Sequence, residues 1–278
     1  MTADVDRAFV RIDEGLVHYR HAGARDDSAA LPIYVAHAGP GSSAGYAPLI
    51  AELGEARFVI APDTLGNGDS AAPAPEVPDL EYYADSICRI LDALDIDKVD
   101  YFGSHTGAHI GCELAIVRPD RVRKMIFDGI GIFDTALREE MLANYAPEMA
   151  PDEFGTQFTW AWHFLRDQMI HFPYFKRDPE HRILTEMPPP EALHGMVTEV
   201  LKAVTTYHHG YRAVFRHEAD KRLPLVKIPS LFMAAEPDPL TAFLDDVSGL
   251  VPGSEQRLIT LEDGLSVRVG AILAFFAP

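Results

Sequence analysis

The sequence predicts an α/β fold in which a mostly parallel central sheet of about eight strands is flanked by helices and carries an inserted helical lid. β-like runs alternate with segments of helical length, as in chains built from βαβ units. The alternation is interrupted over residues 135–223, which are rich in Trp, Phe, His and Met and have the pattern of several helices. Because the sheet needs strands from both sides of this stretch, we expect a core of residues 1–134 and 224–278 and a lid of residues 135–223.

Strands and helices follow one another in a regular order along this core. The expected strands are residues 8–12, 16–21, 31–36, 57–61, 98–102, 124–127, 230–234 and 256–260. The expected helices are residues 46–53, 80–94 and 108–117, one after Pro239, and a last one that runs to Phe276. The segments 37–43 and 62–70 are rich in Gly, Pro and polar residues and can only be loops. They follow expected strands, where parallel sheets build their sites.

Composition restricts the classes of partner and compartment. With 278 residues, 47% of them hydrophobic, the chain is long enough for one large core or for a core with a small subdomain. A net charge of −18 opposes binding to nucleic acid or to anionic membrane surfaces, and no apolar run is long enough for a transmembrane helix. The acidic start of the chain has no apolar signal core, so we expect a cytoplasmic protein with a small-molecule substrate; a homodimer stays open.

Cysteine and histidine residues give no metal or cofactor signature. Cys88 and Cys112 fall inside expected helices and are interpreted as buried thiols. The 12 histidines are scattered, without an H-E-x-x-H motif or a Cys/His cluster. We therefore expect neither a bound metal nor a cofactor.

A histidine stands at the centre of a glycine-bounded turn between the expected strand 98–102 and the expected helix 108–117. Gly103 and Gly107 lie two residues to either side of His105, the spacing of the sharp elbow that presents a nucleophile in G-x-S-x-G proteins. The central position here holds an imidazole in place of the usual hydroxyl. Such an elbow projects only its central residue into the pocket, so we expect the neighbouring Ser104 and Thr106 to be satisfied within the fold.

Together with other segments, this elbow resembles the α/β-hydrolase superfamily. The other segments are the loops 37–43 and 63–70, the run 118–124 and the loop 233–240. The resemblance covers nearly the whole chain outside the lid. It implies the fold predicted above and a hydrolytic site at the elbow.

The resemblance also assigns roles to particular positions. His105 occupies the nucleophile position and Asp238 the acid position, with Glu236 as an alternative acid. The loop at Ala38 and Gly39 is expected to supply one backbone N–H of an oxyanion hole. The resemblance further implies that the N–H of Thr106 is the second oxyanion donor and that His37 braces the oxyanion loop by hydrogen bonds.

The chain departs from the family pattern in two places. One is His105 itself, and the other is the run 261–267, which has no histidine where the family carries its catalytic one. Two of the three triad positions are changed, so an acyl-serine mechanism is not expected.

Three interpretations of His105 follow. It acts as a general acid or base with the oxyanion hole, either in ester or C–C bond cleavage or in a lyase, decarboxylase or isomerase that passes through an enolate. Alternatively, it attacks the substrate covalently and is acylated. In the third interpretation the protein only binds a ligand, like a receptor. We favour the first, as a hydrolase, because the fold hosts hydrolysis most often. We expect the helix N-terminus to lower the pKa of His105 and favour its neutral form.

Acidic side chains in the loops have competing structural roles. Asp238 either orients a histidine of the lid or begins the helix after Pro239. Asp63 and Asp69 are expected to cap turns in their loop.

Aromatic and histidine side chains of the lid are the remaining candidates for substrate binding. With His37, the candidates are Trp160, Trp162, His163, His208 and His209. The adjacent pair His208 and His209 is the first place to look for a replacement acid–base group. Aromatic residues at helical spacing are more often core than pocket, but a lid covers the cleft, so we expect some of them to contact a small apolar or aromatic carbonyl compound.

Overall fold

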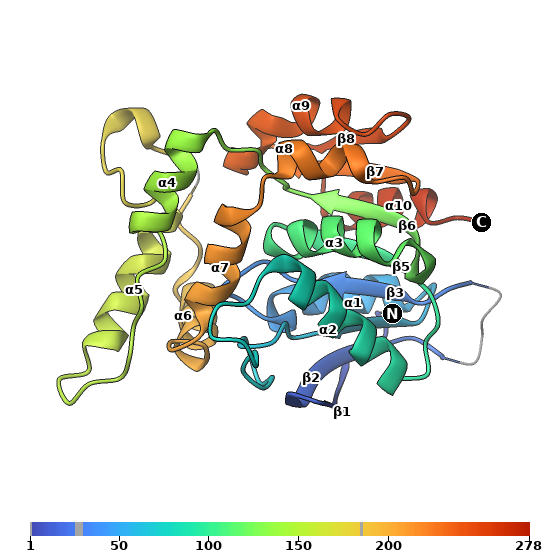
Figure 1. Cartoon of the computed structure of the whole chain (residues 1–278), viewed down its shortest axis with the longest axis horizontal. Coiled ribbons are helices and arrows are strands. Elements are labelled where there is room, and N and C mark those ends of the chain that lie inside the picture. The colour runs from blue at the N-terminus through green and yellow to red at the C-terminus, as the bar shows by residue number, and fades with distance from the viewer. Residues whose placement is uncertain (1, 26–29, 184–185) are drawn as a thin grey trace.

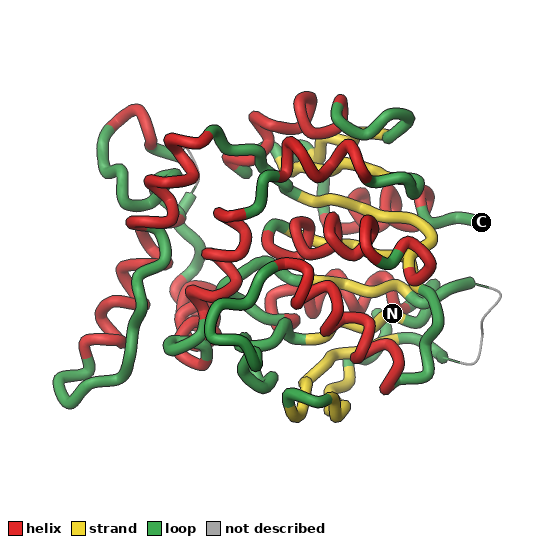
Figure 2. Tube along the Cα trace, in the orientation of Figure 1, coloured by secondary structure: helices red, strands yellow, loops and turns green. Residues whose placement is uncertain are grey.

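A single eight-stranded sheet forms the centre of the computed structural model, which describes residues 2–25, 30–183 and 186–278 (Figures 1 and 2). The strand order is β1-β2-β4-β3-β5-β6-β7-β8. β1 and β2 form an antiparallel hairpin, β2 pairs antiparallel with β4, and every other pair is parallel. The strands are β1 (Asp6–Ile12), β2 (Gly15–Ala22), β3 (Ile33–Ala36), β4 (Val59–Pro62), β5 (Val99–Ser104), β6 (Val122–Asp128), β7 (Ser230–Ala235) and β8 (Glu255–Ile259). The predicted mostly parallel sheet is confirmed.

Helices cover both faces of this sheet. α1 (Ala47–Gly54) and α10 (Leu265–Phe275) pack on one face around Phe102 and Ile126. α2 (Leu80–Ala93), α3 (Thr106–Val117) and α9 (Leu244–Gly249) pack on the other. Cover on both faces explains why the central strands read as unbroken apolar runs rather than as alternating ones: all residues of β3, β4 and β5 are buried.

Among the described residues between β6 and β7 there are five α-helices. They are α4 (Thr135–Asn144), α5 (Thr156–Gln168), α6 (Pro190–Lys202), α7 (Tyr207–Arg216) and the short α8 (Ala219–Arg222). In Figure 1, α4 to α7 stand beyond one end of the sheet, with α7 nearest to it. The helical character expected for residues 135–223 is therefore found.

Most expected elements are present, with boundaries moved by at most two residues. The expected helix from 108 already begins at Thr106, directly after the elbow. The helix expected after Pro239 is instead a 3₁₀ turn, Pro239–Phe243, followed by α9. Among the described residues, no helix combines the length and the hydropathy needed to span a membrane.

Candidate active site

His105 sits at a strained turn between β5 and α3. Its backbone angles are φ 49° and ψ −108°, a positive φ that non-glycine residues rarely adopt. The two flanking glycines are required by close backbone approach. A Cβ on Gly103 would lie 2.5 Å from the carbonyl oxygen of Gly107, and one on Gly107 would lie 2.5 Å from that of Ala36. The elbow predicted from the G-x-H-x-G spacing is thus present in the backbone.

Asp238 is the partner of His105. The His105 Nε2 atom lies 2.6 Å from Asp238 Oδ2. The other carboxylate oxygen of Asp238 accepts the N–H of Leu240 at 2.8 Å and so begins the 3₁₀ turn after β7. The sequence left two roles open for Asp238. The structure shows that Asp238 begins the 3₁₀ turn after β7. It also shows that Asp238 contacts the elbow histidine, His105, and not a histidine of residues 135–223.

Gly129, directly after β6, makes room for this pair. Its φ is 70°, and a Cβ there would lie 2.8 Å from His105 Nε2 and 3.2 Å from Asp238 Oδ2. Any side chain at this position would therefore push the two residues apart.

The pKa of His105 is raised above its usual range. Burial alone lowers it, but the charge of Asp238 and the hydrogen bond to it outweigh burial. The expectation that the N-terminus of α3 would lower this pKa is wrong, because the carboxylate lies in direct contact with the ring and sequence alone did not pair them.

The pKa of Asp238 is shifted in the opposite direction to that of His105. Burial raises its pKa, but the charge of His105 and the hydrogen bond from it leave the pKa below its usual range. The ionised carboxylate can only accept, so His105 Nε2 carries a proton and Nδ1 of the neutral ring holds the lone pair.

His37 braces the loop after β3. Its Nε2 accepts the N–H of Thr64 at 2.9 Å, and its Nδ1 lies 2.9 Å from the carbonyl oxygen of Ala38. Burial lowers the pKa of His37, and the two contacts together require a neutral ring with the proton on Nδ1. This geometry matches the bracing role that the resemblance implied.

The same loop lies against the start of α3. The N–H of Ala38 donates to the hydroxyl of Tyr46 at 3.3 Å and is therefore engaged. A Cβ on Gly39 would lie 3.0 Å from Thr106 Oγ1, so these two residues are neighbours. Neither Gly39 nor Thr106 directs its N–H at an acceptor in the part of the chain that the structure describes.

A charged pair behind the elbow was not found from the sequence. The carbonyl oxygen of Asp128, at the end of β6, accepts the N–H of His105 at 2.9 Å, and its carboxylate forms an ion pair with Arg268 of α10. Burial raises the pKa of Asp128, with Arg268 and His105 acting against it. Ser104 is buried and bonds to Asp128 and to Tyr46. No short motif joins these positions, so only the fold could bring them together.

The aromatic candidates of residues 135–223 lie in different surroundings. Trp160 packs against Phe164 and Tyr207, with ring centroids 4.8 and 5.0 Å away. Trp162 and His163 are exposed on α5. Their contact with a substrate stays a prediction.

His208 and His209 lie together on α7, with ring centroids 4.2 Å apart. They line a surface pocket with Glu148 and Arg212, and His105 is not among the residues that line it. Burial lowers the pKa of both, to about 4 for His208. The structure therefore does not bring this pair to His105 as the replacement acid–base group that the sequence suggested.

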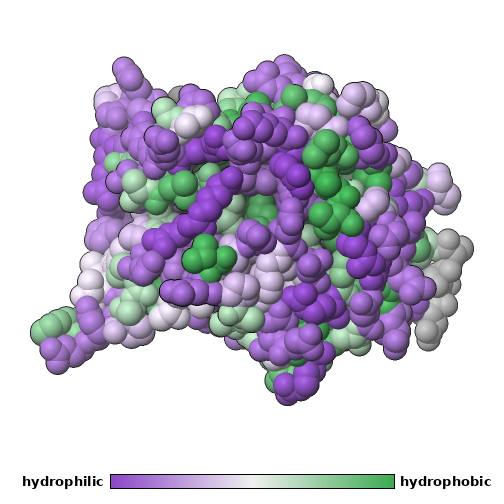
Figure 3. All heavy atoms as spheres, in the orientation of Figure 1, coloured by the Kyte–Doolittle hydropathy of each residue, from purple (hydrophilic) through white to green (hydrophobic). Residues whose placement is uncertain are grey.

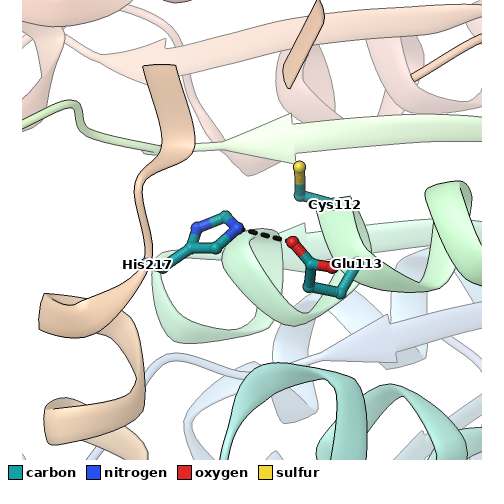
Figure 4. Close-up of side chains that lie close together, drawn as sticks. All are labelled: Cys112, Glu113 and His217. Atoms are coloured by element: carbon teal, nitrogen blue, oxygen red, sulfur yellow. Dashed lines mark hydrogen bonds and ion pairs between the residues drawn. The ribbon is translucent and has the colours of Figure 1, made fainter. Parts of the chain in front are cut away.

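Two groups of potential metal donors were not foreseen. Within the described ranges, Cys112, Glu113 and His217 approach one another (Figure 4), as do His18, Asp63 and Asp69. Their charges are already matched inside the protein: Arg222 binds both oxygens of Glu113, and His18 lies 2.8 Å from Asp63. Burial also raises the pKa of the Cys112 thiol, which opposes the thiolate form that metals bind. Both groups fit hydrogen-bond networks better than cation sites.

Comparison with known proteins agrees with this geometry. The family model described as alpha/beta hydrolase fold matches residues 32–257. The chain belongs to this family. Among relatives of this alpha/beta hydrolase, 2-hydroxymuconate semialdehyde hydrolase of Pseudomonas sp. (strain CF600) is 37% identical over 107 residues, 37% of this chain and 38% of the relative. Putative carbamate hydrolase RutD of Caulobacter vibrioides (strain NA1000 / CB15N) is 33% identical over 86 residues, 31% of this chain and 32% of the relative.

Each of these alignments spans less than two fifths of the relative's own length. Solved structures match over nearly the whole chain. The enol-lactonase of Burkholderia xenovorans LB400 has a TM-score of 0.71 and 18% identity, covering 96% of this chain and 99% of its own. A hydrolase of Pseudomonas aeruginosa PA01 has a TM-score of 0.72 and 18% identity, covering 98% and 99%. At this identity the likeness shows the fold alone.

Proposed function

We propose that this alpha/beta hydrolase cleaves an ester or a C–C bond in a small carbonyl compound, without a serine nucleophile and without a cofactor. The contact between His105 and Asp238 carries the proposal. It leaves His105 Nδ1 as a base whose pKa is raised toward the range where general-base catalysis works best.

In the proposed reaction, His105 Nδ1 takes a proton from water while the oxygen of that water attacks the substrate carbonyl. The negative charge that develops on the carbonyl oxygen is held by backbone N–H groups. Because the Ala38 N–H is engaged by Tyr46, we assign the two donors to Gly39 and Thr106. The imidazolium of His105, stabilised by Asp238, then returns the proton to the leaving group as the carbonyl re-forms.

The relatives support a carbonyl substrate. Their names describe hydrolases of a semialdehyde and of a carbamate, each of which contains a carbonyl group. We further propose that residues 135–223 act as a lid over the site, with Trp160 and its aromatic neighbours favouring an apolar or aromatic substrate.

A lyase or isomerase is the second candidate. The observation that favours it is a base at the elbow, where no hydroxyl nucleophile stands, near two N–H groups without an acceptor among the described residues. This arrangement also suits proton abstraction beside a carbonyl. Product analysis separates the candidates, because only hydrolysis incorporates oxygen from labelled water.

The decisive experiment is turnover of a panel of nitrophenyl esters by His105→Ala. We expect kcat/KM to fall by about 10²–10⁴-fold, the usual contribution of a general base. His194→Ala, at an exposed position of α6, is the matched control and should leave activity unchanged. A fluorophosphonate probe should not label the wild type.

Several outcomes would contradict the proposal. Serine-type labelling, or His105→Ala with full activity, would remove His105 from the chemistry. An acyl adduct on His105, detected by mass spectrometry, would replace general-base catalysis by covalent attack. A protein that binds carbonyl ligands and turns none of them over would be a receptor.

A further inference from the structure

A buried chain of polar side chains connects α3 with the segment between α7 and α8. His109 Nδ1 lies 2.9 Å from His217 Nδ1, and His217 Nε2 lies 2.8 Å from Glu113 Oε1. Arg222 completes the chain with a forked pair of hydrogen bonds to Glu113. Figure 4 shows the central contact, with His217 reaching from its loop to Glu113 on α3. The proposed mechanism uses none of these four residues.

The charge of Glu113 determines the direction of the hydrogen bonds at this end of the chain. Burial raises the pKa of Glu113, but its bonds to His217 and Arg222 dominate and lower the pKa to about 2. Glu113 is therefore ionised and can only accept, so His217 Nε2 carries a proton. Burial lowers the pKa of His109 well below its usual range, so its ring is neutral, and its Nδ1 atom shares one proton with Nδ1 of His217 across 2.9 Å. Each contact of the chain thus has a proton between two polar atoms, as a buried polar network needs if it is to stabilise a fold.

These bonds fix the residue that follows α7 close to the site. His217 caps the C-terminus of α7, and its partner His109 on α3 lies one helical turn after His105. At the other end of α7, the Thr206 hydroxyl donates to the carbonyl oxygen of Gly66 at 2.5 Å. Both ends of the helix are thus tied to the core by side-chain hydrogen bonds.

The middle of α7 crosses the start of α3. A Cβ placed on Gly210 would lie 3.8 Å from Thr106 Cγ2, so this helix lies over the residue whose N–H is one proposed oxyanion donor. Figure 1 shows α7 running past that end of α3. Movement of α7 would therefore change how far the N-terminus of α3, with the Thr106 N–H, is shielded by this helix.

We propose that His109, His217 and Glu113 form a clamp that holds α7 over the oxyanion-donor end of α3 and thereby closes the site. They are positioning residues, since they act through α7 and not on the substrate. This role rests on the proposed function of the site, but the clamp itself is a property of the fold. Opening it would admit water to the donors and weaken their hold on a developing charge.

The test compares two substitutions of one residue. His217→Leu removes both hydrogen bonds. His217→Gln can restore them, because its amide oxygen can accept from His109 and its NH₂ group can donate to Glu113. His194→Leu, on the exposed face of α6, is the matched control.

Hydrogen–deuterium exchange of the full chain is the first readout. In His217→Leu we expect exchange over residues 207–216 to rise by about 10- to 100-fold, the equivalent of losing hydrogen bonds to a charged network. Exchange in β5 and β6 should not change. His217→Gln and His194→Leu should match the wild type.

Ester kinetics are the second readout. We expect kcat for a nitrophenyl ester to fall about 10-fold in His217→Leu, with KM changed less, and to recover in His217→Gln. The proposal of a clamp would be contradicted if exchange in α7 did not change in His217→Leu. It would also be contradicted if α7 exchanged as fast in His217→Gln as in His217→Leu. A wild type that turns over no ester would contradict the proposed function instead, and the exchange data would still decide the clamp.

Discussion

At the scale of single residues, one contact changes the chemistry available to the elbow. A histidine at the end of a helix-starting turn is expected to be neutral and weakly basic, because the helix N-terminus carries partial positive charge. The direct contact of His105 with Asp238 reverses this effect. The His105 ring of this pair therefore takes up a proton more readily than a free imidazole and can return it.

This contact predicts the pH dependence of activity. His105 must be neutral to act as a base, and its pKa is raised, so kcat/KM should rise with pH through an inflection above 6.5. Asp238→Asn removes the negative charge that raises this pKa, so the inflection should move to lower pH. The measurement is a pH–rate profile of both proteins with one ester. An inflection that stays in place in the variant would show that Asp238 does not control the base.

At the scale of elements, the loop after β4 is held by one buried carboxylate. Asp63 contacts His18 of β2 and accepts the N–H of Ser43 at 2.9 Å and of Asp69 at 3.0 Å. Asp63 was expected only to cap a turn, but it joins a strand and two loops. His37 of the oxyanion loop accepts the N–H of Thr64 in the loop after β4. The position of the oxyanion loop therefore depends on the loop that Asp63 holds.

Gly68 is the point at which this loop is most sensitive. Its φ is 55°, and a Cβ there would lie 2.1 Å from Asp63 Oδ2. We expect Gly68→Ala to lower the free energy of unfolding by about 2 kcal/mol or more, from backbone strain and displacement of the carboxylate. Gly45→Ala is the control, because a Cβ there meets nothing within 4 Å. Equal urea midpoints for the two variants would contradict this account of the loop.

At the scale of the whole molecule, another buried carboxylate links several segments at the end of the sheet that lies opposite the site. Asp100, fully buried at the start of β5, pairs with Arg57 at 2.6 Å and with Arg123 of β6 at 2.6 Å. Arg57 also donates to the carbonyl oxygen of Phe276 at 3.3 Å. Strands β5 and β6, the turn before β4 and the end of α10 therefore meet at one charge, at the other end of β5 from His105.

Removing this charge should cost stability. We expect Asp100→Ala to lower the free energy of unfolding by about 3–5 kcal/mol, because two partly buried guanidinium groups lose their partner. Asp120→Ala, which breaks an exposed pair with Arg118, should cost at most about 1 kcal/mol. Urea unfolding measures both. A small loss in Asp100→Ala would mean that water replaces the carboxylate.

Local sequence patterns were enough to predict the sheet, the elbow and the helical character of residues 135–223. Apolar runs and their spacing specify strands and helices locally, and G-x-H-x-G specifies a turn because only glycine permits the close backbone approaches at Gly103 and Gly107. His105, Asp238 and the 37–43 loop could all be named from their positions relative to these elements.

Which of these groups contact one another depends on the three-dimensional packing of the strands and loops. Asp238 meets His105, and not a histidine of residues 135–223, because β6 and β7 are neighbours in the sheet and Gly129 leaves the space between them open. Tyr46 engages the Ala38 N–H, and His217 reaches His109, across chain separations that no local pattern encodes. Protonation and donor availability depend on such contacts, since charge and hydrogen bonding act over a few ångströms in space.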